Sequence, residues 1–176
     1  EIIAYLNGAL GDASLNKGRR IRFSQKNKQW LVNLQSLLKQ ISCNSWIYKE
    51  GKQRNIWVLE TLCKDLNFAF NPSGLESDAE KACYTKGFFD AEGGIPHTRD
   101  RFYIQLVQKN FGKIEQIKSL LSDLGIESGK IHNPSKKVDP DYWRIFVSTK
   151  HHQRFAQVVN SYHPVKLKIF CERMKI

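Results

Sequence analysis

Two stretches of the chain repeat one pattern of apolar and polar positions. QKNKQWLVNLQSLLKQI begins at Gln25, and QKNFGKIEQIKSLLSDL begins at Gln108, at an offset of 83 residues. In both stretches apolar residues recur at spacings of three and four, which predicts an amphipathic helix. Asn27 and Asn110 stand just before the periodic residues and are predicted N-caps. The match runs without a gap and indicates an internal duplication.

The residues before each predicted helix alternate between polar and apolar side chains. This alternation in RIRFSQ and YIQLVQ is typical of a half-buried strand. After each helix come two more strand-like runs around a turn, and then a short helix, giving the order αββαββα twice. The strands are expected at residues 20–25, 103–108, 45–61 and 129–149, and the later helices at 63–70, 151–162 and 165–176.

These elements predict an α+β fold with two pseudo-symmetric halves, residues 1–74 and 75–176. The turn-rich stretch NPSGLESD, residues 71–78, is the expected linker. Each half has an antiparallel sheet with helices on one face only, so the other face meets solvent or a ligand. Two such sheets side by side form a polar saddle.

The charge of the chain suggests what this saddle binds. Lys and Arg total 28 against 17 acidic residues, a net charge of +11 with a pI near 9.6. We expect a polyanion, and a β-ribbon carrying Arg and Gln fits the major groove of duplex DNA. Few aromatic residues other than Tyr103 are expected on these faces, which favours duplex over single strands. The predicted DNA-binding residues are Arg20, Arg22, Ser24, Lys49, Lys52, Arg54, Arg101, Tyr103, Gln105, Lys136, Lys137 and Arg144.

A membrane and a disulfide framework are not favoured by the sequence. No apolar run approaches the roughly 18 residues that span a bilayer. The four cysteines are scattered without a C-x-x-C pair, which favours reduced thiols in an intracellular protein.

Two apolar phrases of similar composition each end on an acid. YLNGALGDAS contains Asp12, and YTKGFFDAEGG contains Glu92. Gly87 and Ala91 lie four residues apart, so they allow a second helix backbone to approach closely. If the two helices pack there, both acids lie at helix C-termini, where they repel each other and need a cation. Oxygen ligands facing a phosphodiester suit Mg²⁺.

The first phrase admits two alignments with the second. If Gly8 corresponds to Gly87, the acidic position falls on Ala13, which cannot bind a metal. If Asp12 corresponds to Glu92, the close-packing positions become Asn7 and Gly11. We favour the second alignment, because a helix seam tolerates one larger residue more easily than a metal site tolerates alanine.

The two phrases resemble the paired signature helices of the LAGLIDADG homing endonucleases in their single-chain form. The duplicated αββαββα order is similar to that family as well, so the resemblance covers essentially the whole chain. It implies a monomer with internal pseudo-twofold symmetry that cleaves both strands of a long DNA site and leaves short 3′ overhangs. Family members reside in introns or inteins. The implied cofactor is Mg²⁺ or Mn²⁺, with Ca²⁺ as a non-catalytic substitute.

The resemblance also implies a set of site residues. One acid of each signature helix binds metal, so Asp12 and Glu92 are expected metal ligands, together with the preceding Gly11 and Ala91. Residues at the end of the second strand of each repeat lie near the scissile phosphates in this family. The matching candidates are Gln25, Lys26, Gln108 and Lys109, which orient water or stabilise phosphorane charge. Alternatively, Gln-Lys-Asn is only a strand exit and a helix cap.

A non-cleaving nucleic-acid binder on the same fold is the alternative function. An RNA maturase with intron RNA as its partner, or a DNA-binding regulator, is compatible with the irregular first phrase.

Overall fold

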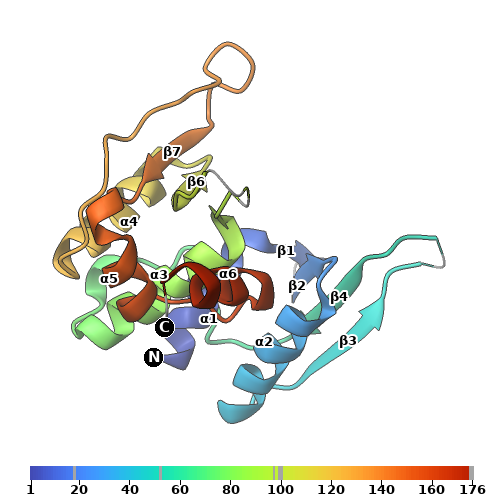
Figure 1. The fold of residues 1–176 in the computed structure, drawn as a ribbon. Helices are drawn as coiled ribbons and strands as arrows, with labels where there is room; N and C mark the ends of the chain where they lie inside the picture. The colour runs from blue at the N-terminus through green and yellow to red at the C-terminus, as the bar shows by residue number, and fades with distance from the viewer. Residues whose placement is uncertain (18, 52, 97, 99–100, 175–176) are drawn as a thin grey trace.

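Two helices pack against each other between two antiparallel sheets (Figure 1). The computed structural model describes residues 1–17, 19–51, 53–96, 98 and 101–174. The two central helices are α1 (Ile2–Gly8) and α3 (Asp78–Glu92). The α+β fold class is confirmed. In these described ranges no helix has both the length and the apolar character needed to cross a membrane.

The first sheet follows α1 directly through a single 3₁₀ turn, η1 (Ala9–Asp12). Its strands are antiparallel in the order β1-β2-β4-β3. Helix α2 covers the inner face, where Trp30, Leu31, Leu34 and Leu38 are buried. The elements are β1 (Ala13–Asn16), β2 (Arg20–Gln25), α2 (Lys28–Gln40), β3 (Ser45–Lys49) and β4 (Trp57–Thr61).

The second sheet is smaller and has the order β5-β6-β7. Helix α4 packs on it with Ile114, Ile117, Leu120 and Leu121 buried, the same helix face that the repeat predicts. The elements after α3 are β5 (Gly93–Gly94), β6 (Gln105–Gln108), α4 (Phe111–Asp123), β7 (Trp143–Phe146), η3 (Thr149–His151), α5 (His152–Val158) and α6 (Pro164–Met174).

Both predicted N-caps are confirmed. The Asn27 side chain accepts hydrogen bonds from the backbone N–H groups of Gln29 and Trp30, and Asn110 accepts one from that of Lys113. These bonds satisfy the first free amides of each helix, which fixes where the helix begins after the strand.

The predicted αββαββα order is wrong at two points. Residues 63–70 form turns instead of a helix, because the side chains of Asn7 and Asn67 bind backbone groups of this segment. The run 129–149 supplies one strand, β7, and its first part forms no strand: it meets β7 at a bridge between His132 and Arg144 and at a hydrogen bond from the Gly129 amide to the Phe146 carbonyl. There Asn133 holds a loop that contains two prolines, which cannot donate ladder hydrogen bonds.

The seam between α1 and α3 is built on two glycines. A Cβ on Gly8 would lie 2.1 Å from the carbonyl oxygen of Tyr84, and one on Gly87 would lie 2.0 Å from that of Tyr5. The two contacts are reciprocal, so these glycines are the pseudo-twofold counterparts of each other. Their missing side chains let the helix backbones touch.

A buried polar cluster joins the two halves beside this seam. The Asp90 carboxylate on α3 accepts hydrogen bonds from the Tyr5 hydroxyl at 2.8 Å, the Tyr162 amide at 2.8 Å and the Ser161 hydroxyl. The Tyr5 hydroxyl in turn accepts one from the Trp30 indole of α2. These donors offset the cost of burying a carboxylate and fix α1, α2 and α3 relative to the segment before α6.

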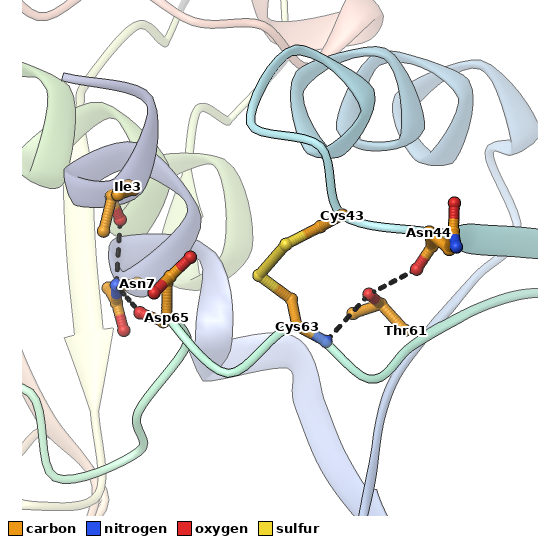
Figure 2. The surroundings of a disulfide bond; sticks show 7 residues. All are labelled: Ile3, Asn7, Cys43, Asn44, Thr61, Cys63 and Asp65. Carbon is orange, nitrogen blue, oxygen red and sulfur yellow. Dashed lines mark hydrogen bonds between the residues drawn. A yellow bond between two sulfur atoms is a disulfide. The ribbon is translucent and has the colours of Figure 1, made fainter.

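The expectation of reduced thiols is wrong for two of the four cysteines. A disulfide joins Cys43, after α2, to Cys63, after β4 (Figure 2). The helix and the last strand of the first half end close to each other, although 20 residues separate the two cysteines in sequence. Sequence spacing alone did not reveal this proximity. Cys83 and Cys171 are free thiols.

We predict that Gly87→Ala destabilises the protein by about 2–3 kcal/mol, because the new methyl group meets backbone atoms that cannot yield without separating the helices. Gly74→Ala is the control, since a Cβ there has no atom within 4 Å. Urea unfolding of both variants measures the difference. Equal midpoints would contradict the close packing of the seam.

Candidate functional site

The C-terminal ends of the seam helices carry the two acids singled out by the sequence. Helix α3 continues as an α-helix from Gly87 to Glu92, five residues later, whereas α1 changes to the 3₁₀ turn η1 after Gly8 and reaches Asp12 in four. Four 3₁₀ steps advance about 8 Å and turn about 480°, and five α-helical steps advance about 7.5 Å and turn about 500°. The tighter turn therefore compensates for the missing residue.

This geometry resolves the choice between the two alignments. Gly8 corresponds to Gly87 in the seam, so Asn7 is not a close-packing position, and instead it binds the 65–67 segment. Asp12 nevertheless lies close to Glu92. The evidence is the preceding residue, Gly11, where a Cβ would be 2.5 Å from the Glu92 Cγ. Ala13 is the first residue of β1 and no longer part of the helix that ends beside Glu92. The first alignment is therefore correct for Gly8, and the second is correct for Asp12.

Each acid is accompanied by the glutamine that ends the second strand of its repeat. The Gln25 side-chain amide donates to the Asp12 carboxylate at 2.6 Å. A hydrogen bond from Gln108 lowers the pKa of Glu92, although burial raises it more. A strand-end glutamine therefore interacts with the acid of each seam helix.

Burial makes both carboxylates hard to ionise without a counter-charge, and the charge of Glu92 adds to this effect at Asp12. Burial, followed by the charge of Glu92, raises the pKa of Asp12 to about 6. The pKa of Glu92 is raised by burial. Two oxygen donors that resist ionisation at a negative helix end fit a divalent cation, which would lower both pKa values again.

Lys166 of α6 is a site residue that sequence reasoning missed. Its ammonium donates to the last-turn carbonyl oxygens of Phe89 at 2.5 Å and Asp90 at 2.8 Å on α3. Burial lowers its pKa to about 8, against the charges of Asp90, Asp12 and Glu92, which raise it. It therefore supplies positive charge at the helix end where the acids meet. Its position 74 residues after Glu92 gives no local sequence signal.

The two lysines predicted beside the acids form no hydrogen bond or ion pair with Asp12 or Glu92 in the described part of the chain. Lys26 is exposed in the turn before α2, and the described residues include no hydrogen-bond or ion-pair partner of its side chain. The Lys109 ammonium lies 3.8 Å from an Asp139 carboxylate oxygen and its side chain is largely exposed. Gly11 and Ala91 precede the acids in η1 and α3. The roles of all four residues stay predictions.

The predicted DNA-binding residues follow the outer faces of the two sheets and the loops beyond them. Register puts Arg22 of β2 opposite Glu60 of β4, and puts Gln105 of β6 opposite Phe146 of β7. The Arg144 guanidinium donates to Gln105 at 3.3 Å. Lys52 lies outside the described residues. The exposed members of the set are Arg20, Ser24, Lys49, Arg54, Arg101, Lys136 and Lys137, and Tyr103 is partly buried against Phe146.

The expectation of few aromatic residues on these faces is wrong. Trp46 and Tyr48 of β3 are each 37% exposed on the outer face of the first sheet. On the second sheet the Arg144 guanidinium lies 4.7 Å from the Phe146 ring centroid. The alternation in SWIYK contained the signal, because it places Trp46 and Tyr48 on the same face.

Residues 79–160 match the sequence model of the LAGLIDADG-like domain, which begins in α3 and ends after α5. The chain has the LAGLIDADG fold. The resemblance seen in the sequence is confirmed by this match and by similar solved structures. No curated protein sequence matches the chain.

The homing endonuclease I-DmoI is one such structure. Its complex with DNA and Mn matches with a TM-score of 0.64 at 20% identity, covering 93% of this chain and 99% of that one. Its complex with DNA and Ca gives a TM-score of 0.69 at 21% identity over 98% and 97% of the two chains. The N-terminal LAGLIDADG domain of DUF199/WhiA matches with a TM-score of 0.68 at 16% identity, over 99% and 88%.

We predict that Asp12→Asn stabilises the metal-free protein by about 2 kcal/mol at about pH 7.5. The folded state holds the Asp12 proton more tightly than the unfolded state does, so ionised Asp12 costs stability above pH 6. This cost disappears as the pH falls through about 6 to about 4, so the two proteins converge there. Urea unfolding in EDTA across this range measures it.

Asp141→Asn, at an exposed position before β7, is the control and changes stability little. A metal-free Asp12→Asn protein no more stable than wild type would show that Asp12 is not under this electrostatic strain.

We also predict energetic coupling between Lys166 and Glu92. Lys166→Met destabilises the metal-free protein, and it does so by about 1 kcal/mol less when Glu92→Gln is also present. The reason is that one negative charge facing Lys166 has been removed. A double-mutant cycle by urea unfolding in EDTA measures the coupling, and additive effects would contradict it.

Proposed function

We propose that this protein is a site-specific endonuclease that hydrolyses both strands of duplex DNA with divalent metal ions. The observation that carries the proposal is the pair of carboxylates at the end of the α1–α3 seam, each hydrogen-bonded by a strand-end glutamine. Two equivalent half-sites across one pseudo-twofold axis suit two antiparallel scissile strands. Similarity to I-DmoI, solved with DNA and with Mn or Ca, supports both the partner and the type of cofactor.

The residues at the seam fit a divalent cation, with Mg²⁺ as the proposed physiological ion. Asp12 and Glu92 would hold it with carboxylate oxygens, assisted by the carbonyl groups of Gly11 and Ala91. When bound, the cation supplies positive charge to the phosphodiester under attack. Gln25 and Gln108 hold the two carboxylates in place, and Lys166 keeps a cation at the helix end.

Lys26 and Lys109 are proposed to act on the phosphate charge once DNA is bound. Both begin the turn between a strand and a helix, beside the glutamines that contact the acids. Their long side chains are exposed and can turn toward a phosphate on the saddle. Short 3′ overhangs are the product that the resemblance to the LAGLIDADG homing endonucleases implies.

A non-cleaving DNA-binding protein is the second candidate function. The N-terminal domain of DUF199/WhiA has the same fold at a similar TM-score, so the fold by itself does not assign cleavage. The paired acids favour the nuclease, because a surface that only binds DNA gains nothing from two half-buried carboxylates that repel phosphate. Nothing in the structure supports intron RNA as a partner over duplex DNA.

We predict that wild-type protein with Mg²⁺ linearises some members of a supercoiled plasmid pool with randomised inserts, and that these members share one sequence. On a plasmid carrying that sequence, Asp12→Asn and Glu92→Gln each reduce cleavage on the order of 10³-fold, since each removes several kcal/mol of metal-borne stabilisation. Both variants still bind the same duplex in Ca²⁺.

Glu115→Gln, on the exposed side of α4, is the control with the same charge change and cleaves normally. Specific binding without any strand cleavage by wild type would favour the DNA-binding alternative. Nicked circles as the final wild-type product would mean that only one half-site is active.

A further inference from the structure

Glu60 is a buried acid on the sheet face that the proposed function assigns to DNA. In β4, Leu59 points into the core and Glu60 points to the outer face, opposite Arg22 on one side and Trp46 on the other. Only 2% of Glu60 is exposed. A carboxylate in the middle of a phosphate-facing surface weakens binding to any DNA, so its presence calls for another role.

Three side chains from three other strands converge on this carboxylate. The Asn16 amide and the Tyr48 hydroxyl donate to one oxygen, at 3.0 and 3.1 Å. The Arg20 guanidinium donates to the other oxygen at 3.4 Å and lies 5.5 Å from the Trp46 ring centroid. These donors offset the cost of burying the acid and hold β1, β2 and β3 side chains in one arrangement.

Two of these three donors, Arg20 and Asn16, are residue types that read base edges. Arginine recognises guanine, and asparagine recognises adenine, through paired hydrogen bonds in the major groove. A side chain already fixed by a neighbour loses less conformational freedom when it binds. The Arg20 side chain remains 53% exposed while bonded to Glu60, so part of its guanidinium is free for DNA.

We propose that Glu60 is a positioning residue for base readout, which holds Arg20 and Asn16 in the geometry that selects bases in the half-site under the first sheet. The inference rests on the proposed function as a site-specific DNA-binding enzyme. Glu60 lowers the affinity for DNA in general and raises the discrimination between sequences.

The second sheet has no such acid at the equivalent place. The repeat offset of 83 relates Arg22 to Gln105, whose partner across the ladder is Phe146, so Phe146 stands where the first half has Glu60. Phe146 contacts the Arg144 guanidinium and the rings of Tyr103 and His132. The two halves therefore present different chemistry to DNA, and the selected site is not a palindrome.

The test selects duplexes from a randomised pool in Ca²⁺, which separates binding from cleavage, and then measures affinities for every single-base variant of the selected site. Glu60→Gln keeps the shape of the side chain but replaces one acceptor with a donor facing Arg20. We expect discrimination to fall about tenfold at a few adjacent base pairs in one half-site. We also expect affinity for unrelated duplex to rise.

Two comparisons distinguish positioning from a merely structural role. Arg20→Ala or Asn16→Ala must lose discrimination at base pairs that Glu60→Gln also affects. Glu115→Gln, with the same charge change on α4, must leave the whole profile unchanged. A structural role would instead lower affinity evenly across all positions together with the melting temperature.

The outcomes separate this inference from the proposed function. A wild-type protein that enriches no sequence overturns the proposed function and this inference with it. A wild-type protein with a defined site that Glu60→Gln reads with the same discrimination, or with an even loss at every position, overturns the inference alone.

Discussion

The close approach of α1 and α3 is the constraint on which the rest of the structure depends. Two glycines, Gly8 and Gly87, bring the helix backbones into contact, and the C-terminal ends of the helices then meet. That meeting gathers negative charge from two helix ends and from the side chains of Asp12 and Glu92. The Lys166 ammonium packs against the end of α3 and partly offsets this negative charge.

The same constraint explains the irregular first phrase. A one-residue deletion in an α-helix would rotate Asp12 away from the seam, since each residue turns the helix by about 100°. The 3₁₀ turn η1 restores the position of the acid, because each of its residues advances farther along the axis and rotates through a larger angle than a residue of an α-helix. An alignment without gaps can match either Gly8 with Gly87 or Asp12 with Glu92, whereas in the folded chain both pairs correspond.

Much of the fold followed from local pattern. The repeat at Gln25 and Gln108 predicted both amphipathic helices and their caps, because helix periodicity and N-cap chemistry act within a few residues. The disulfide between Cys43 and Cys63, the turns at 63–70 and the role of Lys166 could not be predicted. Each depends on segments far apart in sequence that only the tertiary packing brings together.

The seam also makes the two halves alike at the acids while leaving their sheets free to differ. Each acid has a strand-end glutamine as a partner, Gln25 for Asp12 and Gln108 for Glu92, whereas Glu60 and Phe146 occupy equivalent places with opposite chemistry. In our proposal the centre therefore performs one reaction on two strands, and the outer faces read two different half-sites.

The central claim is that Asp12 and Glu92 form one metal centre across the seam. Electron paramagnetic resonance of Mn²⁺ titrated into the protein bound to its selected duplex tests this most directly. The account predicts tightly bound Mn²⁺ in wild type, weakened by both Asp12→Asn and Glu92→Gln and unaffected by Glu115→Gln. Unchanged Mn²⁺ binding after either carboxylate is neutralised would contradict it.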